Sequence, residues 1–287
     1  MTIVLAKNLP VEDPVDALIK SIRIPPRPSL LVDLQQELSA NEPAPQKIAK
    51  IIANDVGMSG ALLKLVNSPF FGLSRKAKSV EQGITFLGID KCAALVTGLL
   101  ARQAISVKGA SLDRFWDVSA KRAQALVFLS RRLRVCQPDI AHTFGLFCDI
   151  GVPLLMDRFP EYVNTFFEAS NDAAHPFTTV EDLRHNTNHA SIGCLLARNW
   201  GLSTDVSLAI LLHHDYSVME DGATEALVCS LVALSLLAES AIQQYQGLGT
   251  SVEWQKGGSQ ACRHLGLEPD EAADLRDELQ EMFDSER

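Results

Sequence analysis

A thiol and a carboxylate stand side by side at Cys148-Asp149, within the run Gly-Leu-Phe-Cys-Asp-Ile-Gly at 145–151. A cysteine nucleophile needs a neighbouring base and a depressed pKa. The surrounding sequence offers neither, so we expect Cys148 to be a buried, inert thiol. A carboxylate in such an apolar run has to be satisfied by hydrogen bonds. Asp149 is therefore expected to bond to the backbone or to a histidine across the fold.

Histidines in the second half of the chain are the next candidates. His185 and His189 are four residues apart, a spacing that can place two zinc ligands on one face of a helix. The residues between them include no glutamate to act as a general base. Asn188 has the side chain of a helix N-cap, so we expect the pair to straddle a helix start. We predict an internal hydrogen bond between His189 and Asp149 instead of a zinc-protease site.

A second pair of histidines, His213-His214, ends an apolar segment just before Asp215. Adjacent residues on a helix point about 100° apart. We therefore expect one of the two rings to face the interior and the other to face solvent. The simpler alternative is that they stabilise the negative end of the helix dipole.

The elements that must position these side chains are helices. Apolar residues recur at spacings of three and four, no convincing strand pair is present, and the helix–turn alternation has no fixed period. We predict an all-α fold with a linker at 109–113, and N-caps at Ser79, at Asn188 and at either Ser111 or Asp113. One helix should run from Pro138 to about 159 and carry the Cys-Asp pair. The other expected helices are 80–87, 89–104, 113–134, 159–170, 178–186, 188–200, 203–213, 223–245, 252–265 and 268–284.

Composition excludes several classes of protein. The net charge of −9 argues against a broad nucleic-acid surface, which needs an excess of basic residues. The basic cluster of Arg131, Arg132 and Arg134 is expected to be a solvated helix end. Six scattered cysteines without a Cys-x-x-Cys motif indicate a reduced, cytoplasmic setting. The longest apolar stretch, 226–238, is shorter than the roughly 20 residues of a spanning helix, so we expect a soluble protein without a membrane segment.

Two segments are candidates for contact surfaces. Phe70 and Phe71 follow Pro69 in a turn, where they either form an exposed tip for a partner or plug the core. Residues 268–287 form an acidic amphipathic helix that we expect to dock on the bundle, with presentation to a partner as the alternative. Its apolar face carries Leu275, Leu279 and Met282. Trp116 is expected to lie in the core.

Landmarks follow one another along the chain: Ile24-Pro25-Pro26-Arg27-Pro28, the turn at 67–72, Ser79 to Gly88, Phe115-Trp116, the Cys-Asp run, Asn188-His189 to Gly193, Trp200-Gly201-Leu202 and Leu212-His213-His214-Asp215. In order and spacing they resemble the HDOD family (HD-related output domain) over about residues 20–245. The resemblance implies an HD-like helical bundle with a helical N-terminal subdomain, which we expect to divide into 1–108 and 109–287. It also implies a regulatory role in bacterial signalling, generally without hydrolase activity.

The resemblance further implies where an HD phosphohydrolase would hold its metal. In that superfamily a histidine, an adjacent His-Asp pair and later His or Asp ligands bind divalent ions, which activate water and clamp phosphate. Here the first position falls at about Val118, which cannot ligate, and the second is Cys148, a poor ligand for hard ions. The resemblance leaves a vestigial centre in which a residual metal site stays open: Asp149, His189, His213, His214 and Glu239.

These two lost ligands favour a chain with no catalytic residues and no cofactor. We expect a non-catalytic signal-transduction module that acts through protein–protein interaction, with room for a ligand in the vestigial cleft. The alternative is a divergent metal-dependent phosphohydrolase acting on nucleotides or phosphoesters. A pocket that binds a nucleotide second messenger without turning it over is the third hypothesis.

Overall fold

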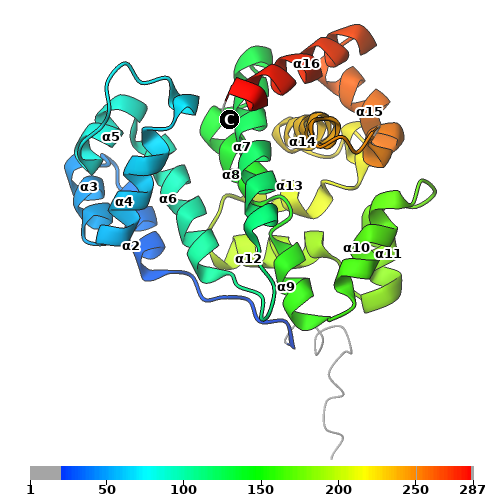
Figure 1. Ribbon diagram of the computed structural model, residues 1–287, viewed down its shortest axis with the longest axis horizontal. Helices are drawn as coiled ribbons and strands as arrows, with labels where there is room; N and C mark the ends of the chain where they lie inside the picture. The colour runs from blue at the N-terminus through cyan, green and yellow to red at the C-terminus, as the bar shows by residue number, and fades with distance from the viewer. Residues whose placement is uncertain (1–20, 250, 286–287) are drawn as a thin grey trace, which may run out of the picture.

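The computed structural model describes residues 21–249 and 251–285, and within them the chain is helical (Figure 1). The described residues form no strand. Their single β-type contact is an isolated antiparallel bridge between Val107 and Ala110. The all-α prediction is therefore confirmed.

The N-terminal group of helices forms the blue-to-cyan lobe of Figure 1. Short polar side chains cap two of its helices, α4 and α5, because they accept hydrogen bonds from N–H groups that the first turn leaves unpaired. Asp55 accepts from the N–H of Met58, and Ser79 from that of Gln82, as predicted for Ser79. The elements are α2 (Ser29–Leu38), α3 (Pro45–Ala53), α4 (Val56–Val66), the 3-10 turn η1 (Pro69–Phe71), α5 (Val80–Leu87) and α6 (Ile89–Ala104).

Of the remaining helices, α8, α14 and α16 pack directly against the long α7, and most bounds lie within a few residues of those predicted. Asn188 caps α12 as expected. The start of α7 has no side-chain cap, since Leu112 rather than Ser111 or Asp113 is its N-cap residue. The elements are α7 (Asp113–Leu133), α8 (Pro138–Phe147), α9 (Gly151–Arg158), α10 (Tyr162–Asn171), α11 (Phe177–His185), α12 (His189–Asn199), α13 (Thr204–Leu212), η2 (Tyr216–Met219), α14 (Ala226–Tyr245), α15 (Val252–Leu265) and α16 (Pro269–Ser285).

The predicted helix from Pro138 to about 159 is interrupted by a turn at 148–150, which separates α8 from α9 although Cys148 and Ile150 keep right-handed helical dihedrals. The turn is closed by tight hydrogen bonds from the N–H of Ile150 to the carbonyl of Phe147 and from Val152 to Asp149. Gly151 permits the close approach of α9 to the start of α12, because a Cβ there would lie 2.0 Å from the carbonyl oxygen of His189. Asp149 thus sits in a corner held against α12, not on a helix face.

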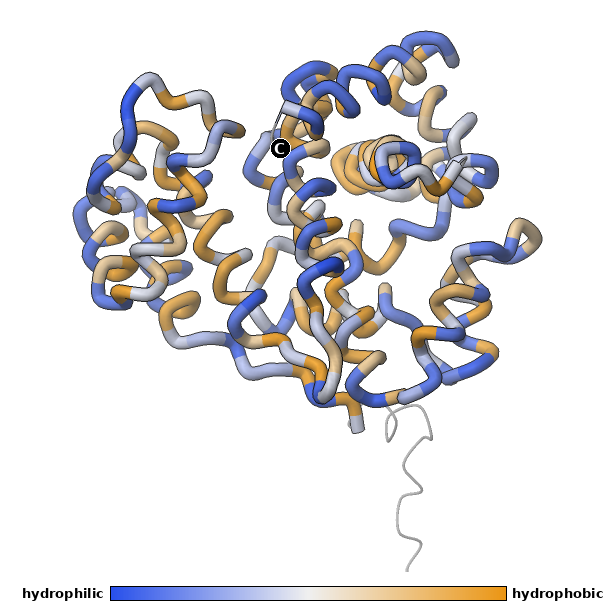
Figure 2. Tube along the Cα trace, viewed as in Figure 1, coloured by the Kyte–Doolittle hydropathy of each residue, from blue (hydrophilic) through white to orange (hydrophobic). Residues whose placement is uncertain are grey.

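One hydrophobic core extends through both groups of helices. It includes Leu34 and Ile52 from the N-terminal lobe together with Phe147 and Leu237 from the larger one. Figure 2 shows the same distribution, with α14 apolar around much of its circumference and α16 hydrophilic along its outer side. The two predicted subdomains therefore share buried surface across the 105–112 connection.

Polar contacts reinforce that shared core at one point. The indole N–H of Trp200 donates to the carbonyl of Pro25 at 2.9 Å, and the Gln35 amide donates to the Trp200 carbonyl at 2.8 Å. Both bonds join the N-terminal lobe to the end of α12. The Pro25 and Trp200 landmarks of the sequence thus meet in space.

Two apolar segments, Pro138–Arg158 and Ala226–Tyr245, are long enough to cross a membrane by length and composition. In the fold, 67% of an apolar 18-residue window in the first and 78% of such a window in the second is buried inside the protein. Core helices of soluble proteins have the same character, so these segments carry no argument for a membrane.

Candidate functional site

A buried polar cluster forms where three helix ends meet. Asp149 comes from the α8–α9 corner, His189 begins α12, and His213 with His214 follows the C-terminal end of α13. Atoms able to bind a metal, one from each of these four residues, all lie within 4.8 Å of one another. The structure therefore brings the central residues of the predicted vestigial site together.

An arginine completes this cluster. The Arg122 side chain reaches from α7, is 3% exposed, and places Nη2 2.7 Å from Asp149 Oδ2. The same nitrogen lies 3.3 Å from Glu239 Oε2 on α14. Its Nε and Nη1 atoms are buried without a hydrogen-bond acceptor among the described residues. A guanidinium thus links the two carboxylates that the sequence analysis considered as metal ligands.

The position predicted for the first lost ligand, at about Val118, is not the one that meets Asp149. Val118 is half-buried and packs against the hydrophobic core. The α7 residue that faces Asp149 is Arg122, one turn further along. A signal was present: Arg122 falls in helical register with the buried Ser119, Ala123 and Leu126, and an arginine on an apolar helix face indicates a buried partner of opposite charge.

Burial and neighbouring charges shift the pKa values of this ion pair in opposite directions. Burial alone would raise the pKa of Asp149, but Arg122 and the nearby histidines lower that pKa well below its ordinary value. The two carboxylates likewise raise the pKa of Arg122 despite burial, so the guanidinium stays charged. Burial raises the pKa of Glu239, and only part of this effect is offset by Arg122. Asp149 is therefore the principal counter-ion of Arg122.

His189 makes different contacts from those predicted. Its Nε2 atom lies 3.7 Å from Asp149 Oδ1, which is beyond hydrogen-bond distance. Its Nδ1 atom lies 2.7 Å from a carboxylate oxygen of the fully buried Glu181, and its Nε2 atom lies 3.1 Å from Nε2 of His213. Tyr162 donates its hydroxyl to Glu181 as well. Glu181, which the sequence analysis missed, is thus the partner that orients the His189 ring.

His213 is the histidine that contacts Asp149. Its Nε2 atom lies 3.3 Å from Asp149 Oδ1, and its Nδ1 atom lies 2.7 Å from the Ile210 carbonyl, to which it must donate. Burial lowers the pKa of His213, but Cys148 and Asp149 outweigh it and raise that pKa to about 10. The raised pKa favours the protonated ring, whose Nε2–H can donate to Asp149. Cys148 is buried as predicted, and it lies close enough to His213 to contribute to the raised pKa of that histidine.

The prediction that one of His213 and His214 faces solvent is wrong, because both are buried. His214 Nδ1 lies 2.8 Å from Oε2 of Glu253 on α15, and Tyr216 donates to the same oxygen. Burial lowers the pKa of His214 to about 4. Burial would raise the pKa of Glu253, but its bonds to His214, Lys256 and Tyr216 lower it to about 2. The His214 ring thus stays neutral and ties α13 to α15.

The donor types at the cluster are those of a metal site, and their protonation decides whether a catalytic ion fits. His189 directs Nδ1 to Glu181 and His213 directs Nδ1 to a carbonyl, so the two Nε2 atoms face each other at 3.1 Å. This contact is satisfied when one nitrogen carries a proton, which the pKa of His213 provides. Arg122 holds the other oxygen of Asp149. Arg122 and His213 therefore approach Asp149 from its two oxygens, while the four donor atoms remain close enough together to hold an ion.

Other predicted residues lie elsewhere. Phe71 packs against the core, whereas Phe70 lines a surface groove with α7 and α16. His185 ends α11 and contacts Thr165, so it does straddle a helix start with His189. The C-terminal helix docks on the bundle as expected, through Ala272, Leu275, Leu279 and Phe283. Trp116 is buried.

Comparison with known families gives a match to a family model described as HDOD domain, over residues 24–216. An uncharacterized protein of Treponema pallidum (strain Nichols) is 23% identical over 219 residues, which are 74% of this chain and 42% of that protein. The uncharacterized protein YuxH of Bacillus subtilis (strain 168) is 29% identical over 116 residues, 40% of this chain and 28% of that protein. This chain thus spans less than half the length of these curated relatives.

Solved structures show the same fold. An HDOD domain protein of unknown function from Geobacter sulfurreducens has a TM-score of 0.71 and 18% identity, over 95% of this chain and 96% of that one. A protein from Marinobacter aquaeolei VT8 named "Putative signal transduction protein" has a TM-score of 0.69 and 18% identity, over 97% and 61%. One from Shewanella amazonensis SB2B named "Putative phosphohydrolase" has a TM-score of 0.67 and 19% identity, over 93% and 94%.

Proposed function

Since the chain belongs to the HDOD family, we propose that it is a non-catalytic signal-transduction module that regulates a partner through protein–protein contact. In this proposal the polar cluster around Asp149 is scaffold. It holds the ends of α9, α12 and α13 against α7 and α14, and the surfaces that meet the partner lie outside it. The name of the Marinobacter aquaeolei structure agrees with a signalling role.

The observation that carries the proposal is the Arg122 guanidinium against Asp149 and Glu239. Metal-assisted hydrolysis needs an ion with an open position for water and phosphate. Here a charge that belongs to the chain engages the carboxylates that would hold the ion. A buried carboxylate paired in this way is a structural group, since separating it from arginine would leave both charges uncompensated.

The experiment is metal analysis combined with a hydrolysis assay on the full chain. We expect well under one equivalent of metal to be retained after incubation with Mn²⁺, Fe²⁺, Zn²⁺ or Mg²⁺ and desalting. We also expect no hydrolysis of p-nitrophenyl phosphate, bis(p-nitrophenyl) phosphate or nucleotides that depends on Asp149. Asp149→Ala is the test variant, and Asp117→Ala, on the exposed side of α7, is the matched control. A stoichiometric ion together with hydrolysis lost only in Asp149→Ala would overturn the proposal.

A divergent phosphohydrolase is the second candidate, and one observation favours it. Nε2 of His189, Nε2 of His213 and Oδ1 of Asp149 converge at separations of 3.1–3.7 Å. The name of the Shewanella amazonensis protein points the same way. The assay above decides between the two candidates. A thermal-shift panel of nucleotides, with and without metal, tests the third hypothesis of a nucleotide bound without turnover.

A further inference from the structure

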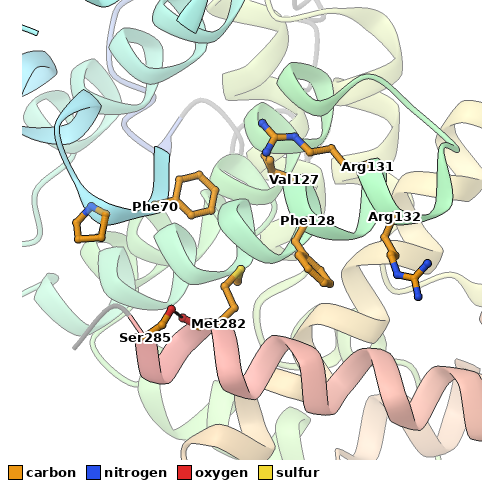
Figure 3. A pocket seen from close by; sticks show the side chains of 8 residues that line it. Phe70, Val127, Phe128, Arg131, Arg132, Met282 and Ser285 are labelled. Carbon is orange, nitrogen blue, oxygen red and sulfur yellow. Dashed lines mark hydrogen bonds between the residues drawn. The ribbon is translucent and has the colours of Figure 1, made fainter. Parts of the chain in front are cut away.

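A surface groove lies between η1, the C-terminal half of α7 and the end of α16 (Figure 3). Its volume is about 510 Å³. Phe70 comes from η1, Phe128 from α7 and Met282 from α16, and the figure shows the three side chains directed toward the space between the elements. Three segments distant in sequence therefore build one apolar floor.

The floor has the chemistry of a site for an apolar anchor. Phe70, Phe128 and Met282 are each half-buried, and Val127 beneath them is buried. Aromatic rings and a flexible thioether adapt to partner side chains and supply much of the energy of peptide-binding grooves. None of the residues that line the groove belongs to the Asp149 cluster. The role of the groove is therefore separate from that of the scaffold described above.

The rim of the groove is basic although the whole chain is acidic. Arg131 and Arg132 supply the charged side chains of the lining, on a chain whose net charge is −9. A smaller hollow continues from it, shares Arg131 and adds Lys91, against one carboxylate, Asp139. Arg132 lies 3.7 Å from Glu278, but both side chains are exposed and such a pair is weak. No carboxylate of the described residues lies within ion-pair distance of Arg131.

We propose that this groove binds an acidic amphipathic segment of a partner protein, with a large apolar side chain on the floor and carboxylates against Arg131 and Arg132. Charge complementarity selects the occupant, because the rim offers guanidinium groups that pair with carboxylates in a two-pronged geometry. Two helices, α7 and α16, form the walls of the groove. Grooves of this kind bind the apolar face of an amphipathic helix from a partner. The inference deepens the proposed interaction function and rests on it.

The experiment begins with selection of random peptides of about 16 residues, four to five helical turns, displayed on phage against the purified full chain. We expect enriched sequences with Asp or Glu beside Leu, Phe or Trp. A synthetic, fluorescently labelled peptide from that pool is the probe for polarisation titrations. Arg131→Glu and Phe128→Ala should each weaken its binding by about tenfold or more.

The control variant is Arg114→Glu, which makes the same charge change on the exposed surface of α7, outside the groove lining. It should change affinity by less than about twofold at moderate salt. Circular dichroism of each variant separates lost binding from lost folding. Enrichment of basic or neutral peptides, of none, or of peptides insensitive to Arg131→Glu would overturn the proposal.

A negatively charged membrane is the other partner class that a basic rim could attract. Sedimentation with phosphatidylserine–phosphatidylcholine vesicles tests it, and Arg131-dependent vesicle binding without acidic-peptide binding would also overturn the proposal. The outcome is distinguishable from that of the proposed function. A metal-free, inactive protein that binds no acidic peptide loses only the groove inference, whereas a metal-dependent hydrolase that binds the peptide loses only the non-catalytic assignment.

Discussion

At the scale of single residues, Arg122 and Asp149 form an ion pair in which each compensates the charge of the other. Replacing Arg122 by alanine removes the principal counter-ion of Asp149, and we expect the free energy of unfolding to fall by about 3–5 kcal/mol. Asp149→Ala should cost a similar amount. The double variant should cost clearly less than the sum, because the pair is lost only once. Urea denaturation of the four proteins measures these differences, and additive losses would contradict the coupling.

The protonation of His213 predicts how stability depends on pH. Its pKa is about 10 in the fold against an ordinary value of 6.5. A raised pKa means that the stabilisation is complete below about pH 6.5 and is lost as the pH rises toward 10, by at most about 1.4 kcal/mol per pH unit. Urea midpoints across this range should fall in the wild type. They should fall less in His213→Gln, and equal slopes would refute the assignment.

His214 predicts the opposite dependence of stability on pH. Its pKa is lowered to about 4, so it contributes stability that is present above about pH 6.5 and is lost as the pH falls toward 4. His142, whose pKa burial also lowers to about 4, acts in the same direction. The loss of stability at high pH and the loss at low pH together place the stability maximum near neutral pH. A maximum at pH 9 or above would contradict the raised pKa of His213, and stability that does not fall between pH 6.5 and 4 would contradict the lowered pKa values of His214 and His142.

The sequence predicts the residues of the Asp149 cluster better than it predicts their contacts, because many of the contacting residues are far apart in the chain. Asp149, His189 and His213 are identifiable from their residue types and the family landmarks. Their partners are not, because Glu181 and Glu253 are joined to histidines eight and 39 residues away across helix ends. The side chain that faces Asp149 from α7 depends on the rotation of that helix, so the prediction fell one turn short at Val118.

At the scale of elements, helix boundaries were accessible from sequence where a local side chain sets them. Ser79 and Asn188 cap their helices as predicted because the bond spans only three residues. The corner at 148–150 was missed because nothing local demands it. It follows from packing, since α9 approaches the start of α12 so closely that only glycine fits at position 151.

That contact predicts the effects of three glycine replacements. In Gly151→Ala the new methyl would meet the backbone of His189 at 2.0 Å, so we expect a loss of about 3 kcal/mol or more. Gly98→Ala meets only the flexible tip of Leu146 and should cost less. Gly60→Ala, in the exposed face of α4 with nothing within 4 Å, should stabilise by roughly 0.5–1 kcal/mol. Thermal denaturation gives the order, and a tolerated Gly151→Ala would contradict the packing.

At the scale of the whole molecule, the continuous core predicts one unfolding transition. The sequence suggested a boundary near residue 108, yet Trp200 bonds to Pro25 across it and the buried clusters merge. Tryptophan fluorescence and far-ultraviolet circular dichroism should therefore give the same denaturation midpoint. Two separated midpoints would indicate independent units. Gln35→Ala, which removes a bond to the Trp200 carbonyl, should lower that single midpoint without splitting it.

The guanidinium beside Asp149 also determines what this protein needs from its surroundings. A bound metal ion can be removed by a chelator, exchanged for a competing ion, or missing when the supply is low. The positive charge of Arg122 is built in at translation and is present in every copy of the chain. The corner between α8 and α9 therefore has its counter-charge at every level of metal supply, and iron or manganese starvation leaves that ion pair unchanged.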